Sequence, residues 1–275
     1  MAGDAGARVI EALEPALRLG VFAGVLLGLI VLERAAPRRP RVQSWIARLR
    51  TNGALVILNT VAARGLAFLA APLAATGAAL WAQSNGVGSF NVIEAPAVVA
   101  GVAVFLVLDL AVWAQHVVFH RVPLFWRLHR VHHADRDFDA TTGFRFHPAE
   151  IMVSMLWKAA VVIALGAPVA AVIVFEIALN ACAMFNHANV ALPRRLDAVL
   201  RPVIVTPDMH RVHHSVHRDE HDTNFGFCLS VWDRLFGLYR AQPRGGHEGM
   251  TVGLADAQDE APSRLWWSMV LPFRR

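Results

Sequence analysis

Cysteine and charged residues are both scarce in this chain. Its two cysteines, Cys182 and Cys228, are too few for an iron–sulfur cluster, which typically takes four, and they indicate no disulfide framework. Any electrons that its chemistry needs must therefore come from another protein. Charged residues make up 17%, against roughly 25% in soluble domains, while 56% of the chain is hydrophobic, against roughly 45–50%. This balance is typical of a membrane protein.

Two further patterns are missing. The net charge is +5, but the arginines are scattered between apolar runs and form no stripe, which argues against nucleic-acid binding. Asp4, Glu11 and Glu14 precede the first apolar run and positive charge follows it, which is the reverse of a cleaved signal peptide. We therefore expect a first apolar segment that stays in the membrane.

Long apolar runs predict several membrane crossings, since about 20 apolar residues span the bilayer core. Three candidates cover residues 17–32, 53–81 and 95–113. The second is long, which predicts either one tilted helix or a helix that breaks near Pro72. A fourth stretch, 151–185, is divided at Gly166-Ala167-Pro168 and predicts a helical hairpin. The expected fold is all-α, a multi-pass transmembrane helix bundle.

Histidines are the most informative residues present. Eight of the thirteen fall into three short clusters: His116 and His120; His129, His132 and His133; His210, His213 and His214. Residues at i and i+3 or i+4 share a helix face, so each cluster aims two or three imidazoles in one direction. Imidazole is a common ligand for iron, zinc and copper. Eight converging imidazoles exceed the needs of one tetrahedral zinc ion, which predicts a histidine-rich helical cap that holds a dimetal site.

The arginine distribution predicts which side of the membrane the histidines face. Six arginines lie in or beside the loop between the first two spans: Arg34, Arg38, Arg39, Arg41, Arg48 and Arg50. Short loops rich in arginine usually stay in the cytoplasm. Successive crossings then bring His116, and everything from His187 onward, to that side. We expect a multi-pass integral membrane protein, of the inner membrane in a bacterium, with its histidine clusters facing the cytoplasm.

Four more residues are candidates for completing or supporting the site: His147, His187, Asp109 and Asp208. The two histidines could add ligands, and the two carboxylates could hold the second ring nitrogen of a ligand. His147 precedes a proline that can begin a helix, so a position just before that helix is the alternative. We expect His217 and His247 at plain surface positions, while His221 stays open between a ligand and a loop residue.

With these motifs in order, the chain resembles the fatty acid hydroxylase and sterol desaturase superfamily, whose members are integral-membrane, histidine-rich di-iron enzymes. The resemblance covers about residues 105–240. Beyond the three clusters it includes Asp109-x-x-x-Trp113-x-x-His116, Arg145-Phe146-His147-Pro148, His187-Ala188-Asn189 and Asn224-Phe225-Gly226. It divides the chain into N-terminal transmembrane helices with a basic loop (1–94), a di-iron catalytic domain (95–240) and a C-terminal tail (241–275). Trp266 and Trp267 beside arginine predict that the tail lies at the membrane interface.

The resemblance also implies a site and a reaction. The iron ligands, which are also the catalytic residues, would be His116, His120, His129, His132, His133, His210, His213 and His214, with His187 as a further metal ligand. Some members carry another histidine where this chain has Ala183, for which His147 or His217 could substitute. Two iron ions, cycling between Fe2+ and Fe3+, would use O2 to hydroxylate or desaturate a C–H bond of a lipid from the bilayer. The electron donor would be a separate protein, of ferredoxin or cytochrome b5 type with its reductase.

The sequence gives less support to two other classes of function. A histidine-rich protein that binds or transports metal would show ionisable residues near the middle of its spans. Only Arg64 and Asp109 are expected within or near the spans. A zinc hydrolase is disfavoured because the chain has no H-E-x-x-H motif.

Overall fold

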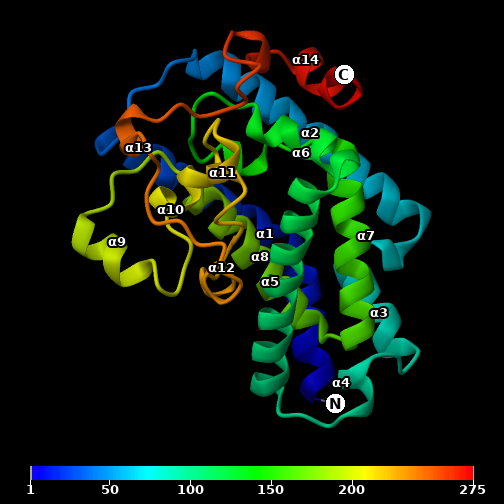
Figure 1. The fold of residues 1–275 in the computed structure, drawn as a ribbon. Coiled ribbons are helices and arrows are strands. Elements are labelled where there is room, and N and C mark those ends of the chain that lie inside the picture. The colour runs from blue at the N-terminus through cyan, green and yellow to red at the C-terminus, as the bar shows by residue number, and fades with distance from the viewer. Residues whose placement is uncertain (1, 275) are drawn as a thin grey trace.

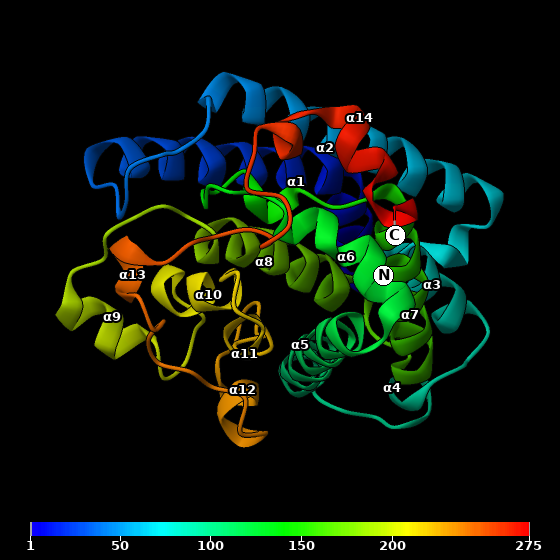
Figure 2. The same cartoon turned by 45° about the horizontal axis from the view of Figure 1, so that its top comes forward.

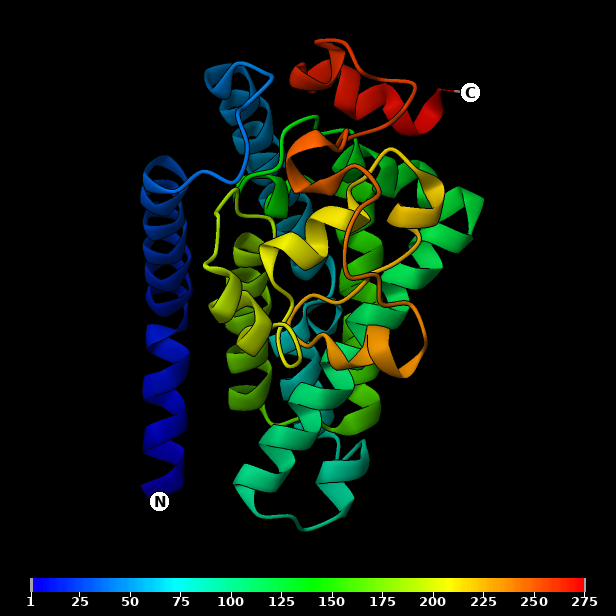
Figure 3. The same cartoon turned by 60° about the vertical axis from the view of Figure 1, so that its left-hand side comes forward.

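The structure is a computed structural model that describes residues 2–274, with side-chain surroundings described from residue 13 onward. The fold is helical, and the only β pairing in the described part is three isolated bridges. Five helices are long and apolar enough to cross a membrane: α1 (Ala2–Ala35), α2 (Trp45–Leu69), α5 (Ala97–Arg121), α7 (Pro148–Leu165) and α8 (Val169–Asn186). The predicted all-α multi-pass bundle is confirmed. Figure 3 shows α1 running along one side of the bundle, with the chain termini at opposite ends.

The second apolar run breaks where the sequence allowed it to. After α2 ends at Leu69, a 3-10 helix, η1 (Ala71–Leu73), contains Pro72, and α3 (Ala75–Ser84) follows. Proline has no N–H to continue the helical hydrogen bonds, so the chain turns there. A Cβ on Gly77 would lie 2.0 Å from the Ala71 carbonyl oxygen, so only glycine allows α3 to fold back this closely.

The predicted hairpin is also present. Gly166 ends α7 with φ 60° and ψ 42°, a left-handed conformation that favours glycine, and α8 begins after Pro168. The short helix α4 (Ser89–Val92) follows Gly88, whose own Cβ would lie 2.1 Å from the Gly166 nitrogen. This close contact joins the hairpin turn to the loop that leads into α5.

The remaining short helices gather at the other end of the bundle, where α5 and α8 end (Figures 1 and 2). They are α6 (Pro123–His133), η2 (Thr142–Phe144), α9 (Arg194–Leu200), α10 (Pro207–His213), α11 (Arg218–His221), α12 (Val231–Leu235), α13 (Gly246–Gly249), η3 (Ala261–Ser263), α14 (Leu265–Val270) and η4 (Leu271–Phe273). We call this end the cap. α5 passes into it without a break, because it continues through His116 and His120 to Arg121.

Buried arginines hold the cap together. Arg48 of α2 pairs with Asp135 through two bonds of 2.7 Å and with Asp139 at 2.5 Å, and all three side chains are about 1% exposed. Burial raises the pKa of Asp135, but the charge and hydrogen bonds of Arg48, together with Arg145 and Thr142, outweigh burial and lower that pKa to about 2. Arg145 donates to the carbonyl oxygens of Val131 and Pro262, at 2.9 and 2.8 Å. These contacts fix the loop after α6 and attach the C-terminal segment to the cap.

The C-terminal segment lies over α2 and α6. Trp267 packs against a core that includes Leu55, Val131 and Leu271, while Trp266 is 76% exposed. The interfacial position of this tail, and the division of the chain at residues 94 and 240, stay predictions.

Candidate metal centre

Nine buried histidines converge in the cap from four helices and the residues that follow them. α5 supplies two, α6 three, the end of α8 one, and α10 with the residue after it three. They form two groups whose ring nitrogens lie within 4.8 Å of one another inside each group. The first group is His116, His120, His129, His133 and His213; the second is His132, His187, His210 and His214. These are the nine residues that the sequence proposed as metal ligands.

The repeated His-Arg-Val-His-His segments each serve both groups. In the first segment, His129 and His133 are four residues apart on one helix face and join the first group, while His132 joins the second. In the other segment the arrangement is reversed, because His210 and His214 join the second group and His213 the first. Adjacent residues on a helix point in different directions, so each His-His doublet can reach two sites at once.

The Nε2 atoms of these histidines face one another at short distances. His116 Nε2 lies 3.0 Å from both His129 Nε2 and His213 Nε2. In the second group, His187 Nε2 lies 3.1 Å from both His132 Nε2 and His214 Nε2. Two imidazoles at right angles on one metal, each about 2.1 Å from it, would hold their nitrogens about 3.0 Å apart. The spacing therefore fits ligands of a shared ion.

The other ring nitrogens explain why these contacts need a cation. The Nδ1 atoms of His116, His187 and His213 lie 2.7, 2.6 and 2.7 Å from the carbonyl oxygens of Phe225, Ala183 and Thr223. A carbonyl only accepts, so each Nδ1 donates and each Nε2 presents a lone pair. Lone pairs that face each other repel unless a positive ion lies between them.

Burial keeps these imidazoles neutral, as metal ligands must be. Loss of hydration lowers the pKa of His129 and of His187 to about 3. Burial, and after it the neighbouring histidines, lower the pKa of His132, His133 and His213 well below 6.5. At neutral pH the site is therefore a set of uncharged imidazoles whose lone pairs are available to a metal ion.

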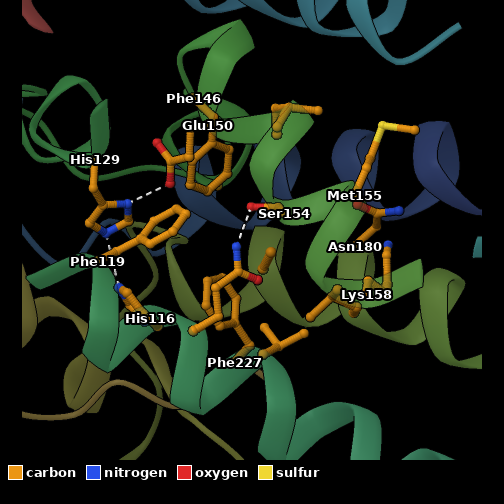
Figure 4. A pocket seen from close by; sticks show the side chains of 16 residues that line it. His116, Phe119, His129, Phe146, Glu150, Ser154, Met155, Lys158, Asn180 and Phe227 are labelled. Carbon is orange, nitrogen blue, oxygen red and sulfur yellow. Dashed lines mark hydrogen bonds and ion pairs between the residues drawn. The ribbon is translucent and has the colours of Figure 1, made fainter. Parts of the chain in front are cut away.

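Glu150 is a residue of this site that the sequence reasoning missed. Its Oε1 lies 2.6 Å from His129 Nδ1, and the residue is 3% exposed (Figure 4). A carboxylate in this position orients the ring and directs its Nε2 toward the first group. A glutamate within an apolar helix is itself a signal of function, and Glu150 stands in the first turn of α7.

Two carboxylates take other roles than the ones expected for them. Asp109 accepts hydrogen bonds from the backbone nitrogens of Cys228 and Leu229 and from the Trp232 indole. It therefore fixes the α12 region against α5 and does not orient a ligating histidine. Asp208 pairs with Arg38 and Arg211. From the sequence, both carboxylates were expected to support ligating histidines, because the sequence does not show which distant loops pack against Asp109 and Asp208.

The remaining candidate histidines lie outside the two groups. His147 directly precedes α7 and its Nδ1 accepts from the Ala149 nitrogen at 3.2 Å, which matches the alternative that placed it just before the helix. His217 is exposed, as expected. The surface position expected for His247 is wrong, because it is 4% exposed and lies 3.6 Å from Asp208. His221 forms a third, smaller cluster with His120 and Asp222.

A cavity of about 190 Å³ adjoins the first histidine group (Figure 4). It lies between α5, α7 and α8, and His116 and His129 line it. Most of the other lining side chains are apolar: Val112, Phe119, Phe146, Ile151, Met155, Leu179, Ala183 and Phe227. The first histidine group thus borders a pocket suited to an apolar molecule.

The spans carry more charge than the sequence reasoning allowed. Lys158 of α7 pairs with Glu176 of α8, and Arg18 of α1 pairs with Glu176 at 2.8 Å. The expectation that only Arg64 and Asp109 would fall within or near the spans is wrong. The three side chains are 16–27% exposed and satisfy one another across three helices.

Two adjacent groups of buried histidines lie at the end of a helix bundle that is apolar enough to cross a membrane. They define a histidine-rich membrane protein with residues that could hold two metal ions. Comparison with protein families agrees. The model of the family described as fatty acid hydroxylase matches residues 101–238, half of the 275-residue chain. The chain belongs to this family, which confirms the resemblance that its motifs indicated.

Several characterised proteins are each similar to about half of the chain. Human alkylglycerol monooxygenase is 28% identical over 148 residues, which is 54% of this chain and 32% of that protein. The ornithine lipid hydroxylase OlsE of Rhizobium tropici is 28% identical over 140 residues, 50% of this chain and 41% of its own. The chain therefore spans about a third to two fifths of these relatives. No solved structure matches.

Proposed function

We propose that the protein is a membrane-bound di-iron oxidoreductase that uses O2 and external electrons to hydroxylate or desaturate a C–H bond of a lipid. The observation that carries this proposal is the pair of neutral imidazole groups, with facing Nε2 atoms, beside a mainly apolar pocket. Membership of the fatty acid hydroxylase family supports the reaction class, and the names monooxygenase and hydroxylase of the relatives agree with it.

Two iron ions held by the nine histidines would activate O2, the oxidant, for cleavage of an unactivated C–H bond, with electrons from the external donor. The chain's own residues would do the rest. His116 and His129 place the first group at the pocket wall, so a bound chain would lie beside it. Glu150 holds the His129 ring in place, and Phe119, Phe146 and Phe227, which line the pocket, would help to keep water out of it.

The position of the bound chain decides the product. Hydroxylation and desaturation both begin with removal of one hydrogen, and a second hydrogen must also come within reach for an alkene to form. The apolar lining from α5, α7 and α8 would fix that position. The substrate would come from the bilayer, and a separate ferredoxin or cytochrome b5 type protein with its reductase would deliver electrons at the cap, which we expect to face the cytoplasm.

Lipid analysis of cells that express the chain tests the proposal. Wild-type protein should produce lipids that have gained one oxygen atom or lost two hydrogens, and 18O2 should label the hydroxylated ones. His129→Ala should abolish both products, while His217→Ala, at an exposed position away from the two groups, should keep them. Products that persist in His129→Ala, or no products from the wild type, would contradict the proposal.

Metal binding or transport without oxygenase activity is the alternative. The charged residues within the spans are what such a protein would show, but Lys158, Glu176 and Arg18 pair with one another and so need no passing ion. Metal uptake into vesicles that contain the protein, without O2 consumption, would favour this alternative.

A further inference from the structure

Asn224 has a backbone conformation that the proposed function does not yet explain. It lies in the segment between α11 and α12, it is fully buried, and its φ is 55°. In the described part of the chain it is the only residue other than glycine with a positive φ. A Cβ makes this left-handed conformation unfavourable, although asparagine tolerates it better than most residues do. Residues held in such conformations cluster at functional sites.

The carbonyl oxygens on either side of Asn224 hold two histidines of the first group. The Thr223 oxygen lies 2.7 Å from His213 Nδ1, and the Phe225 oxygen lies 2.7 Å from His116 Nδ1. The Nε2 atoms of these two rings are 3.0 Å apart. The two peptide groups nearest to Asn224 therefore orient a facing pair of imidazoles that come from different helices, α10 and α5.

The Asn224 side chain fixes the position of this segment. Its Nδ2 donates to the carbonyl oxygens of Met209 and Arg240, at 2.9 and 2.8 Å, and its Oδ1 accepts from the Arg240 nitrogen at 2.9 Å. Its backbone nitrogen donates to the Leu238 oxygen at 2.9 Å. Met209 belongs to α10, the helix that carries His213. The amide therefore joins α10 to the segment after α12 and holds the two carbonyl oxygens against the imidazoles.

The rest of the Asn224-Phe225-Gly226 motif fits the same arrangement. The buried Phe225 ring packs against three imidazoles of the first group, at centroid distances of 5.0–5.4 Å: His116, His120 and His213. A Cβ on Gly226 would lie 2.7 Å from the Leu229 carbonyl oxygen, so no larger residue fits there. The Asp233 carboxylate accepts from the Phe225 and Gly226 nitrogens, at 2.8 and 2.9 Å. Each residue of the motif thus helps to place the segment beside the first group.

The second group depends less on this segment. The Nδ1 atom of His187 is held within α8, by the Ala183 carbonyl oxygen at 2.6 Å. The Asn224 carbonyl oxygen faces His210, but neither ring nitrogen of His210 makes a hydrogen bond. A change at Asn224 should therefore affect the first group more than the second.

We infer that Asn224 is a positioning residue of the first group, because its left-handed backbone and its amide hold the carbonyl oxygens that orient His116 and His213. The inference rests on the proposed metal centre and adds a residue to it. Asn224 acts through the Thr223 and Phe225 carbonyl oxygens, since its side chain makes no hydrogen bond to a histidine. A bond at Nδ1 fixes the rotation of each ring, and with it the direction of the Nε2 lone pair.

Cobalt binding to the full-length protein tests this inference without turnover. Co2+, which nitrogen ligands bind well, is titrated into metal-free protein in detergent against a chelator, which gives an affinity for each of two ions. In Asn224→Ala one ion should bind at least about tenfold more weakly and the other less than about threefold, because a ligating histidine that loses its partner costs about 10- to 100-fold in affinity. The visible absorption of the weakened cobalt site should shift as its rings turn.

Further variants separate the backbone from the side chain. Asn224→Gly removes the strain but also the amide, so its affinity for the weakened ion should lie between those of Asn224→Ala and the wild type. If Asn224→Ala does not fold, Asn224→Gly should still weaken one ion at least about threefold. Asp219→Ala is the control, because it removes only an exposed partner of Arg240 and should leave both affinities unchanged.

Two results would overturn the inference. Both ions could bind equally well to the wild type and to a folded Asn224 variant, so that the segment has no effect on the metal. Alternatively, both ions could weaken equally, which would indicate general loosening of the cap and no specific role in the first group.

The inference and the proposed oxidation fail separately. Unchanged cobalt affinities in Asn224→Ala, in a protein that oxidises lipid, would refute only the inference. Selective loss of one ion in Asn224→Ala, in a protein that forms no O2-dependent product, would refute the oxidation and leave the role of Asn224. A wild-type protein that binds no cobalt would contradict both.

Discussion

His116 and His129 point their Nε2 atoms at each other across 3.0 Å, although they belong to two different helices. The Nδ1 atoms of the two rings are occupied by the Phe225 carbonyl and the Glu150 carboxylate. Neither Nε2 therefore has a proton to share while both rings stay neutral. This contact is unfavourable without a cation and favourable with one, so we interpret the cap as built around metal.

The role of Glu150 in orienting His129 gives the first prediction. Glu150→Ala should weaken metal binding about 10- to 100-fold, the usual cost of losing the partner of a ligating histidine. Glu150→Gln should lose much less, because its amide oxygen can still accept from His129 Nδ1. Competition with a chelator measures both affinities. Ser154→Ala, one turn along the same face of α7, is the control and should leave metal affinity unchanged; equal metal binding by Glu150→Ala and the wild type would contradict the role.

The buried pair of Arg48 and Asp135 gives a prediction about stability. Asp135→Ala leaves a buried guanidinium with only part of its partners, and such a change typically costs about 3–5 kcal/mol. Asp256→Ala removes an exposed partner of Arg130 and should cost less than about 1 kcal/mol. Unfolding of the two variants in the same detergent compares them. Similar losses of unfolding free energy in both variants would contradict a stabilising role for the buried pair.

Acid should destabilise the metal-free protein. The pKa values of His132, His133 and His213 lie well below 6.5 in the folded state, chiefly because of burial, whereas unfolded histidine titrates near its ordinary value of about 6.5. The unfolded chain therefore binds more protons below that pH, so stability is complete above about pH 6.5 and falls as the pH drops further. Thermal unfolding between pH 7.5 and about pH 5 measures this slope.

Two variants provide the comparison for the pH dependence. His132→Ala should flatten the slope, because it removes one group that takes up a proton on unfolding, whereas Ser154→Ala, which removes no ionisable group, should not. A melting temperature that stays constant or rises on acidification would contradict the neutral, buried state of the histidines.

The sequence predicted the parts of the site that depend on local spacing. Intervals of three and four residues identified eight histidines as ligand candidates, and the position of His187 at the end of a helix added the ninth. The structure brings all nine together. Breaks at Pro72 and Gly166 were equally local. Contacts between distant segments were out of reach. Glu150 of α7 meets His129 of α6 across the segment 134–147, and Asp109 and His247 are enclosed by loops whose packing no periodicity reveals.

The division of the histidines into two groups was also beyond the sequence. His132 and His133 are neighbours in the chain, yet they belong to different groups, and so do His213 and His214. Their assignment depends on which helices pack on either side of α6 and α10. Local spacing shows that these residues are ligand candidates, and only the tertiary arrangement shows which of them share an ion.

Metal content of the detergent-purified protein tests the central claim most directly. Elemental analysis should find about two irons per chain, one for each histidine group. His213→Ala in the first group and His132→Ala in the second should each lose iron, while the exposed His217→Ala should retain both ions. One zinc or no metal in the wild type, unaffected by His213→Ala and His132→Ala, would contradict a di-iron site in this cap.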